Sequence, residues 1–163
     1  MRLLLLAVGR LKEGPERLLF NRYHERAISL ARPLGMTGPD LHEITESRAS
    51  QATSRMREEA KILQEKIGDG AFIALDERGT SVTSPLFADW LRKSRESGEK
   101  SLAFVIGGAD GLDQDMRTKA RHVMAFGAMT LPHQLVRVLV AEQLYRAMTI
   151  LSGHPYHLSL IHI

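Results

Sequence analysis

Short apolar runs alternate with segments of helical periodicity along the whole chain. Runs at 3–8, 41–45, 71–75 and 104–106 have the length of buried strands. A further apolar run, 123–131, is broken by Gly127 and closed by Pro132, and we expect the fifth strand near Met129. Between these runs, apolar residues recur every three or four positions over 15–32, 56–67, 84–97, 113–121 and 135–151. The alternation predicts an α/β fold whose sheet is mostly parallel and carries helices on both faces.

Glycines follow the apolar runs in the last third of the chain. Gly107 and Gly108 come after the run 104–106, and Gly127 interrupts the next one. Glycine lets backbone groups approach a ligand, and ligands in open α/β sheets bind at the carboxyl ends of strands. Together with the end of the run 71–75, these turns predict a cleft for a flat heterocycle. The alternative is an ordinary tight turn, and the absence of G-x-G-x-x-G and of Gly-Lys-Ser/Thr argues against a nucleotide-phosphate site.

Composition narrows the class of protein further. A length of 163 residues suits one domain, and 22 Lys and Arg against 19 Asp and Glu weakly favour a polyanionic partner. The chain has no cysteine, which excludes disulfides and thiolate metal sites and suits a reducing compartment. Charged residues follow the first apolar run directly, so we interpret that run as a buried strand and not an export signal. No segment is long and apolar enough to span a membrane.

The final helical segment, 135–151, has apolar residues on more than one side. This pattern suggests burial against its own sheet and against a second copy of the chain, hence a homodimer. Glu142 and Arg146 are four residues apart, which is the spacing of a modest helix ion pair. His154 and His157 lie three apart, but Pro155 prevents a regular helix there and no carboxylate or thiolate completes a ligand set, so we expect no metal.

Several motifs resemble one known family over essentially the whole chain. They are LLAVG, ALDERG, IGGADG, LPHQLVRVLVAEQLYRA and HPYH. The chain resembles the SPOUT-class methyltransferases that act on N3 of pseudouridine in bacterial 23S ribosomal RNA. That resemblance implies an α/β-knot fold with a C-terminal trefoil knot, S-adenosyl-L-methionine as methyl donor, a homodimer, and action on the assembled ribosome in the cytoplasm.

The resemblance also implies roles for particular residues. The cofactor-binding residues would be Leu75, Gly107, Phe126, Gly127, Ala128, Met129, Thr130 and Leu131. On the acceptor side, the catalytic set would be Tyr156 and His157, with Arg137, Glu142 and Arg146 shaping the pocket. Tyr156 and His157 would reach the other subunit's cofactor. The motifs do not assign a general base.

The end of the chain departs from the family pattern. The family usually has an arginine after HPYH and ends close by, whereas this chain continues as Leu158–Ile163. The run LSLIHI resembles a translated library adapter, so we expect a single domain over 1–157 and a non-native tail over 158–163. Two alternatives stay open, namely a non-catalytic ribosome-binding or assembly factor that keeps the fold, and a doubly wound enzyme that uses a nucleotide.

Overall fold

A five-stranded sheet forms the centre of the molecule. The structure, a computed structural model, describes residues 1–162, and side chains as far as Leu158; the expected non-native tail therefore falls largely outside the described side chains. The strands are β1 (Arg2–Val8), β2 (Thr37–Ile44), β3 (Ala71–Ser81), β4 (Ser101–Ile106) and β5 (His122–Ala125). Their order is β2-β1-β4-β3-β5, and every pair is parallel. The predicted parallel sheet is confirmed.

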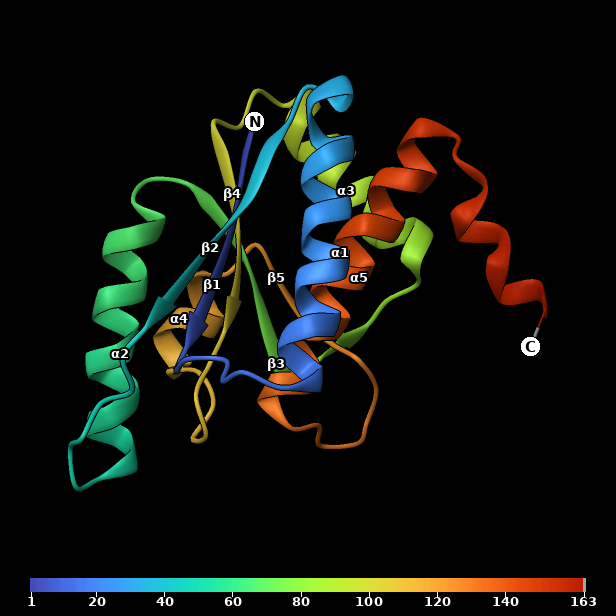
Figure 1. The fold of residues 1–163 in the computed structure, drawn as a ribbon. Helices are drawn as coiled ribbons and strands as arrows, with labels where there is room; N and C mark the ends of the chain where they lie inside the picture. The colour runs from blue at the N-terminus through green and yellow to red at the C-terminus, as the bar shows by residue number, and fades with distance from the viewer. Residues whose placement is uncertain (163) are drawn as a thin grey trace.

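Helices cover both faces of this sheet (Figure 1). On one face lie α1 (Pro15–Ala31), α3 (Ser84–Glu96) and α5 (His133–Ser152), and on the other lie α2 (Ala52–Ile67) and α4 (Gln114–Lys119). Two short 3-10 helices complete the described chain, η1 (Arg32–Leu34) and η2 (Pro155–His162). The three-layer arrangement confirms the predicted fold class.

The apolar runs owe their strand conformation to burial on both sides. In β1, Leu3 and Leu5 belong to the core beneath α1, α3 and α5, while Leu4 and Leu6 belong to the core beneath α2 and α4. Side chains of a strand alternate between faces, so an uninterrupted apolar run is needed where both faces are covered. Within the described residues, no helix is both long and apolar enough to cross a membrane.

Helix α5 is buried by its own chain on several sides. It packs against α1, α3 and η2 as well as the sheet. The apolar residues on more than one side of this helix, from which we predicted a homodimer, therefore already have partners within one chain. The pattern alone does not require a second subunit, and the homodimer stays a prediction.

The expected strand near Met129 is wrong. Strand β5 ends at Ala125, and 126–131 form an irregular loop that leads to α5. Gly127 has a φ of 125°, a conformation that breaks the extended backbone, and the Met129 side chain lies outside the core at 84% exposure. The apolar residues of this loop face a cavity instead of continuing the sheet.

Candidate functional site

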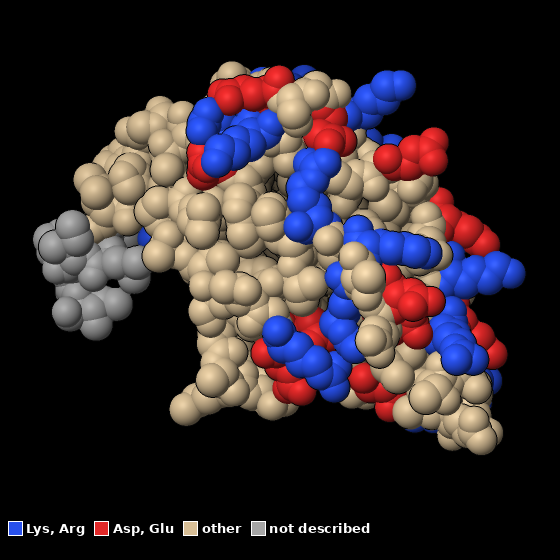
Figure 2. Space-filling view, turned by 180° about the vertical axis from the view of Figure 1, so that it is seen from behind, with Lys and Arg blue, Asp and Glu red and all other residues tan. Residues whose placement is uncertain are grey.

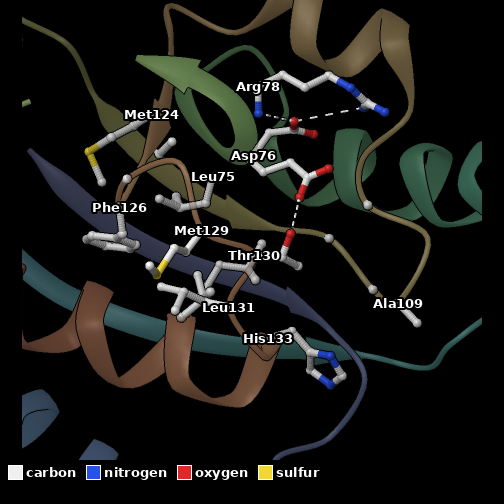
Figure 3. A pocket seen from close by; sticks show the side chains of 18 of the residues that line it. Leu75, Asp76, Arg78, Ala109, Met124, Phe126, Met129, Thr130, Leu131 and His133 are labelled. Carbon is white, nitrogen blue, oxygen red and sulfur yellow. Dashed lines mark hydrogen bonds and ion pairs between the residues drawn. The ribbon is translucent and has the colours of Figure 1, made fainter. Parts of the chain in front are cut away.

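A cavity of about 370 Å³ opens where three neighbouring strands end (Figure 3). Its walls come from the carboxyl ends of β4, β3 and β5, the loop 126–131, and the first turn of α5. The volume lies within the range of small-molecule sites, roughly 300–1,000 Å³. The lining residues are Leu75, Asp76, Glu77, Arg78, Ile106, Gly107, Gly108, Ala109, Asp110, Gly111, Met124, Ala125, Phe126, Gly127, Met129, Thr130, Leu131, His133 and Val136.

The turn after β4 forms one wall and is held tightly. Gly111 N–H donates to Gly108 O at 3.0 Å, and a Cβ on Gly107 would lie 2.6 Å from the Gly111 carbonyl carbon, so only glycine fits. From outside, Arg55 pairs with both carboxylate oxygens of Asp110, at 2.7 and 3.0 Å. Hydrogen bonding to Arg55 lowers the pKa of Asp110. The hydrogen bond within the turn and the Arg55–Asp110 ion pair outside it therefore hold this wall in place.

The end of β3 forms the opposite wall. Met124 of β5 is paired with both Leu75 and Thr80, so residues 76–79 leave the ladder and curve around the cavity. The nearly buried Asp76 carboxylate accepts from Arg78 N–H at 2.9 Å and lies 3.5 Å from Arg117 Nη1. At the mouth, Thr130 Oγ1 donates to Glu77 Oε2 at 3.0 Å, which joins this wall to the loop 126–131.

The cavity gathers most of the residues predicted to bind a cofactor. Seven of the eight line it, and Ala128 is the one that does not. The sequence prediction did not include the charged lining residues Asp76, Glu77, Arg78 and Asp110, although all four lie inside the motifs ALDERG and IGGADG. It also missed His133 and Val136, which line the cavity only because α5 begins directly after the loop.

The residues predicted for the acceptor side form a separate group at the far end of α5. Arg146 Nε donates to Glu142 Oε1 at 2.9 Å, and Tyr156 OH donates to the same oxygen at 3.2 Å. The Arg146 guanidinium also lies 5.0 Å from the centre of the Tyr156 ring, within cation–π range. We call Glu142, Arg146, Tyr156 and His157 the C-terminal cluster.

The cavity and the C-terminal cluster do not meet within one chain. None of the cluster residues lines the cavity, and along α5 the distance from Val136 to Arg146 is about 15 Å at 1.5 Å per residue. Arg137, the fifth residue predicted for the acceptor side, belongs to neither group: its side chain is 1% exposed and points inward to β1. The structure thus separates the predicted catalytic set from the predicted cofactor set.

Tyr156 and His157 differ in the proton transfer that each is suited to. Burial first, and then the neighbouring Tyr23 and Glu142, raise the pKa of Tyr156 above its ordinary value, which keeps its hydroxyl protonated. His157 Nδ1 lies 2.7 Å from His154 O. A carbonyl only accepts, so Nδ1 carries a proton, and in the neutral imidazole the lone pair is then on Nε2. Tyr156 is therefore suited to donate, and His157 Nε2 to accept a proton.

The described side chains, which extend as far as Leu158, include no group of three or more His, Asp or Glu residues close enough together to hold a metal ion. His154 and His157 are engaged in local contacts instead, since Tyr156 N–H donates to His154 Nδ1 at 3.2 Å.

Comparison with known proteins gives a consistent result. The family model described as "Predicted SPOUT methyltransferase" matches residues 1–157. Among curated proteins, the chain is 53% identical to "Ribosomal RNA large subunit methyltransferase H" of Bradyrhizobium sp. (strain ORS 278), covering 96% of this chain and 98% of that protein. It is 55% identical to the protein of the same name from Methylorubrum populi, covering 96% of each.

Solved structures support the fold alone. A probable methylase family protein from Haemophilus influenzae Rd KW20 superposes with a TM-score of 0.52 at 15% identity, covering 95% of this chain and 69% of that one. A probable methyltransferase from Bordetella pertussis Tohama I gives a TM-score of 0.51 at 14% identity, covering 90% of this chain and 95% of that one.

Proposed function

The chain belongs to the SPOUT methyltransferase family, and from this we propose that it methylates N3 of a pseudouridine in bacterial 23S ribosomal RNA, using S-adenosyl-L-methionine. One observation carries the proposal: relatives named as large-subunit ribosomal RNA methyltransferases are more than half identical to the chain over nearly their whole length. We place the reaction on the assembled ribosome, and hence in the cytoplasm.

The cavity fits S-adenosyl-L-methionine by its shape and chemistry. Leu75, Ile106 and Phe126 supply apolar walls for an adenine ring, and the backbone at Gly107 comes close because no Cβ intervenes. Carboxylates of Asp76 and Asp110 lie in the same lining and suit the positive charge and hydroxyl groups of such a ligand. The proposed contacts remain those of the motif residues: Leu75, Gly107, Phe126, Gly127, Ala128, Met129, Thr130 and Leu131.

The residues of the chain have two tasks in this chemistry. When bound, S-adenosyl-L-methionine supplies an electrophilic methyl group: N3 forms a bond to that carbon, the carbon–sulfur bond breaks, and its electron pair stays on sulfur. The cavity must hold the methyl in line with N3. The N3 proton must leave as the bond forms, and we assign its acceptance to His157 Nε2, because the contact of Nδ1 with His154 O orients the ring.

A homodimer would bring the two groups together. Because the C-terminal cluster lies about 15 Å along α5 from the cavity of its own chain, we propose that it completes the cavity of a partner. The surface beside the C-terminal segment supports this, since few charged residues appear on it in Figure 2. Leu86 of α3 is exposed at 43%. Such apolar exposure suits a subunit contact.

We propose two structural features that accompany this function. Residues 1–157 form one domain, and its C-terminal part forms the trefoil knot implied by the family. The knot rests on membership of the family; residues 76–79 leave the β3–β5 ladder beside Met124, where a Cβ on Gly79 would lie 2.7 Å from Met124 backbone atoms. The tail 158–163 is proposed to be non-native.

One observation favours a second candidate, a ribosome-binding or assembly factor without turnover. Position 158 is Leu where the family usually has Arg, and leucine cannot replace a cation beside RNA phosphate. Methyl transfer from labelled S-adenosyl-L-methionine to ribosomes lacking the modification separates the candidates. We expect transfer by the chain as given, and a higher rate when Leu158→Arg is made the last residue. Cofactor binding without transfer in either form would favour the binding factor.

A further inference from the structure

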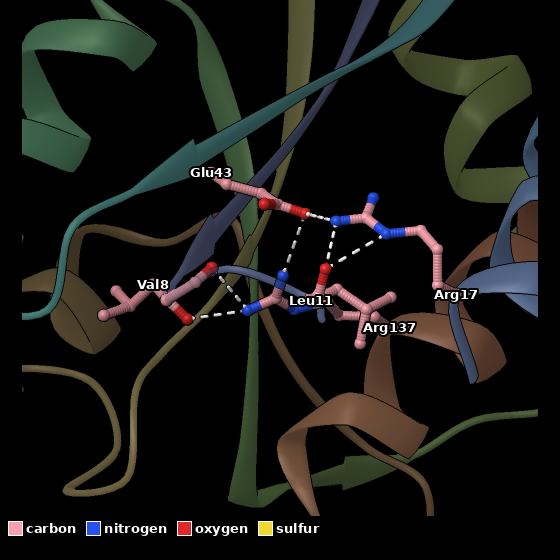
Figure 4. A network of polar contacts seen from close by, with 6 residues as sticks. Val8, Leu11, Arg17, Glu43 and Arg137 are labelled. Atoms are coloured by element: carbon pink, nitrogen blue, oxygen red, sulfur yellow. Dashed lines mark hydrogen bonds and ion pairs between the residues drawn. The ribbon is translucent and has the colours of Figure 1, made fainter. Parts of the chain in front are cut away.

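Arg137 is buried where the start of α5 meets the end of β1 (Figure 4). Its Nη2 donates to both Val8 O and Gly9 O at 2.8 Å, and its Nη1 lies 3.3 Å from Glu43 Oε1. Glu43 is shared with Arg17 of α1 at 2.9 Å. One guanidinium thus connects α5 to the ends of two strands, and through Glu43 to α1.

The carbonyls held by Arg137 lie at a point where the sheet ends. Gly9 N–H still pairs with Ile44 O of β2, but past Ala7 the β1–β4 ladder stops, so the last carbonyls on that side need another donor. A guanidinium offers several donors in one rigid plane and can bond two carbonyls and a carboxylate together. The ammonium group of a lysine cannot form the same set of coplanar hydrogen bonds.

Both sides of this link reach the walls of the cavity. On α5, Val136 lines the cavity and directly precedes Arg137. On β1, Val8 packs beneath the glycine turn: a Cβ on Gly108 would lie 3.0 Å from Val8 Cγ1. The Arg137–Val8 hydrogen bond therefore ties the α5 wall to the Gly108 wall, with a single residue on each side between the bond and the cavity.

We propose that Arg137 is a positioning residue that sets the spacing of these two walls and so the affinity for the cofactor. In this role it acts on the cofactor cavity, whereas the family resemblance implies that it shapes the acceptor side. The inference rests on the proposed function only in that the ligand of the cavity is S-adenosyl-L-methionine. A displacement of about 1 Å in such a site can reduce catalysis about 100-fold, so a link this close to the walls has a measurable effect.

The test compares Arg137→Lys with a core variant of the opposite layer, Leu63→Ala. Leu63 belongs to α2, is fully buried against the sheet and does not line the cavity. Calorimetric binding of S-adenosyl-L-methionine is measured well below each unfolding temperature. We expect about tenfold weaker binding for Arg137→Lys, as for the loss of charge-assisted hydrogen bonds, and unchanged binding for Leu63→Ala despite its lower unfolding temperature.

A second variant keeps the test decisive if Arg137→Lys does not fold. Val8→Ala leaves Arg137 and its hydrogen bonds intact but removes the methyl groups beneath Gly108, and we expect about threefold weaker binding. Unchanged affinity in either folded variant, or an equal loss in Leu63→Ala, would overturn the inference.

Amide hydrogen exchange separates this result from a failure of the proposed function. In the unliganded chain, Arg137→Lys should speed exchange at 107–111 and 126–131, and Leu63→Ala should not. If the unaltered chain binds no S-adenosyl-L-methionine, the proposed function fails, and the exchange result still decides whether Arg137 positions the walls. Equal exchange in both variants would show that its role is only general stability.

Discussion

The two ends of α5 carry groups of different construction. At its start, the sheet places the glycine turn after β4, the loop after β5 and the excursion of β3 around the cavity, and side chains such as Phe126 complete its walls. At its end, the C-terminal cluster is built from side chains, and Glu142, Arg146 and Tyr156 hold one another by hydrogen bonds and a cation–π contact. The first group is shaped by the fold, and the second by contacts between side chains of α5 and η2.

This difference teaches that binding and transfer depend on separate parts of the chain. A cavity made by strand ends is preformed in one subunit, so cofactor binding should survive changes in the cluster. A cluster about 15 Å away along α5 can serve the reaction only when another cavity is brought to it. Variants of the cavity should therefore weaken cofactor binding, and variants of the C-terminal cluster should slow methyl transfer.

The largest effect is expected at Gly107. Gly107→Ala places a Cβ within 2.6–2.9 Å of backbone atoms of Gly111 and Leu112, which forces the turn out of the cavity wall. We expect cofactor affinity to fall about 100-fold or more, with transfer lost as a result. Isothermal titration calorimetry with S-adenosyl-L-methionine measures the affinity.

Gly98→Ala is the matched control for that variant. Unlike Gly107, Gly98 has no atom within 4 Å of its Cβ position; its φ is 81°, so alanine there adds backbone strain of roughly 1 kcal/mol away from the cavity. Its affinity should stay at the unaltered level. Equal losses in both variants would show that stability, and not the wall, controls binding.

The next effect concerns the other end of α5. In His157→Asn, the amide Nδ2 can still donate to His154 O, as Nδ1 does now, but the base atom Nε2 is gone. We expect a transfer rate about 100-fold lower, typical for loss of a general base, and cofactor affinity within about twofold. A single-turnover transfer assay gives the rate. A rate close to that of the unaltered chain would exclude His157 as the base.

The smallest effect tests the support beneath the cavity wall. Glu59 is buried next to Gly108, where its Oε2 would lie 3.5 Å from a Cβ on that glycine. Its Oε1 accepts from Ser47 N–H at 3.0 Å, and burial raises its pKa. The folded state then holds a proton more strongly than the unfolded state, so Glu59 lowers stability as pH rises through its unfolded pKa of about 4.3 toward the folded value. Glu59→Gln should raise the unfolding temperature at pH 7 and leave it unchanged at pH 4. An equal shift at both pH values would contradict this.

Most of the fold could be predicted because burial leaves a clear pattern. The uninterrupted run Leu3–Val8 is explained by a strand covered on both faces, and the glycine turns did lie at neighbouring strand ends. The strand near Met129 was wrong because the pattern shows which residues are apolar but not whether they face a core or a ligand cavity. Phe126 and Leu131 line such a cavity.

The candidate site was harder to predict where contacts between residues far apart in the sequence determine the position of a side chain. Arg137 lies in the same motif as Glu142 and Arg146, yet its hydrogen bonds go to residues 128 and 129 positions earlier in the chain. Helical spacing also could not show that α1 and α3 cover the second apolar side of α5. Both cases have the same cause: local sequence indicates the environment of a residue but not the partner that provides it.

The most direct test of the central claim, that cavity and cluster from different subunits form one active site, is a mixed dimer of two inactive variants. Gly107→Ala supplies an intact cluster and His157→Asn an intact cavity. After unfolding and refolding an equal mixture, half the dimers should contain one complete site, which predicts about a quarter of the unaltered activity in a symmetric dimer. No activity above that of the two variants refolded separately would contradict the claim.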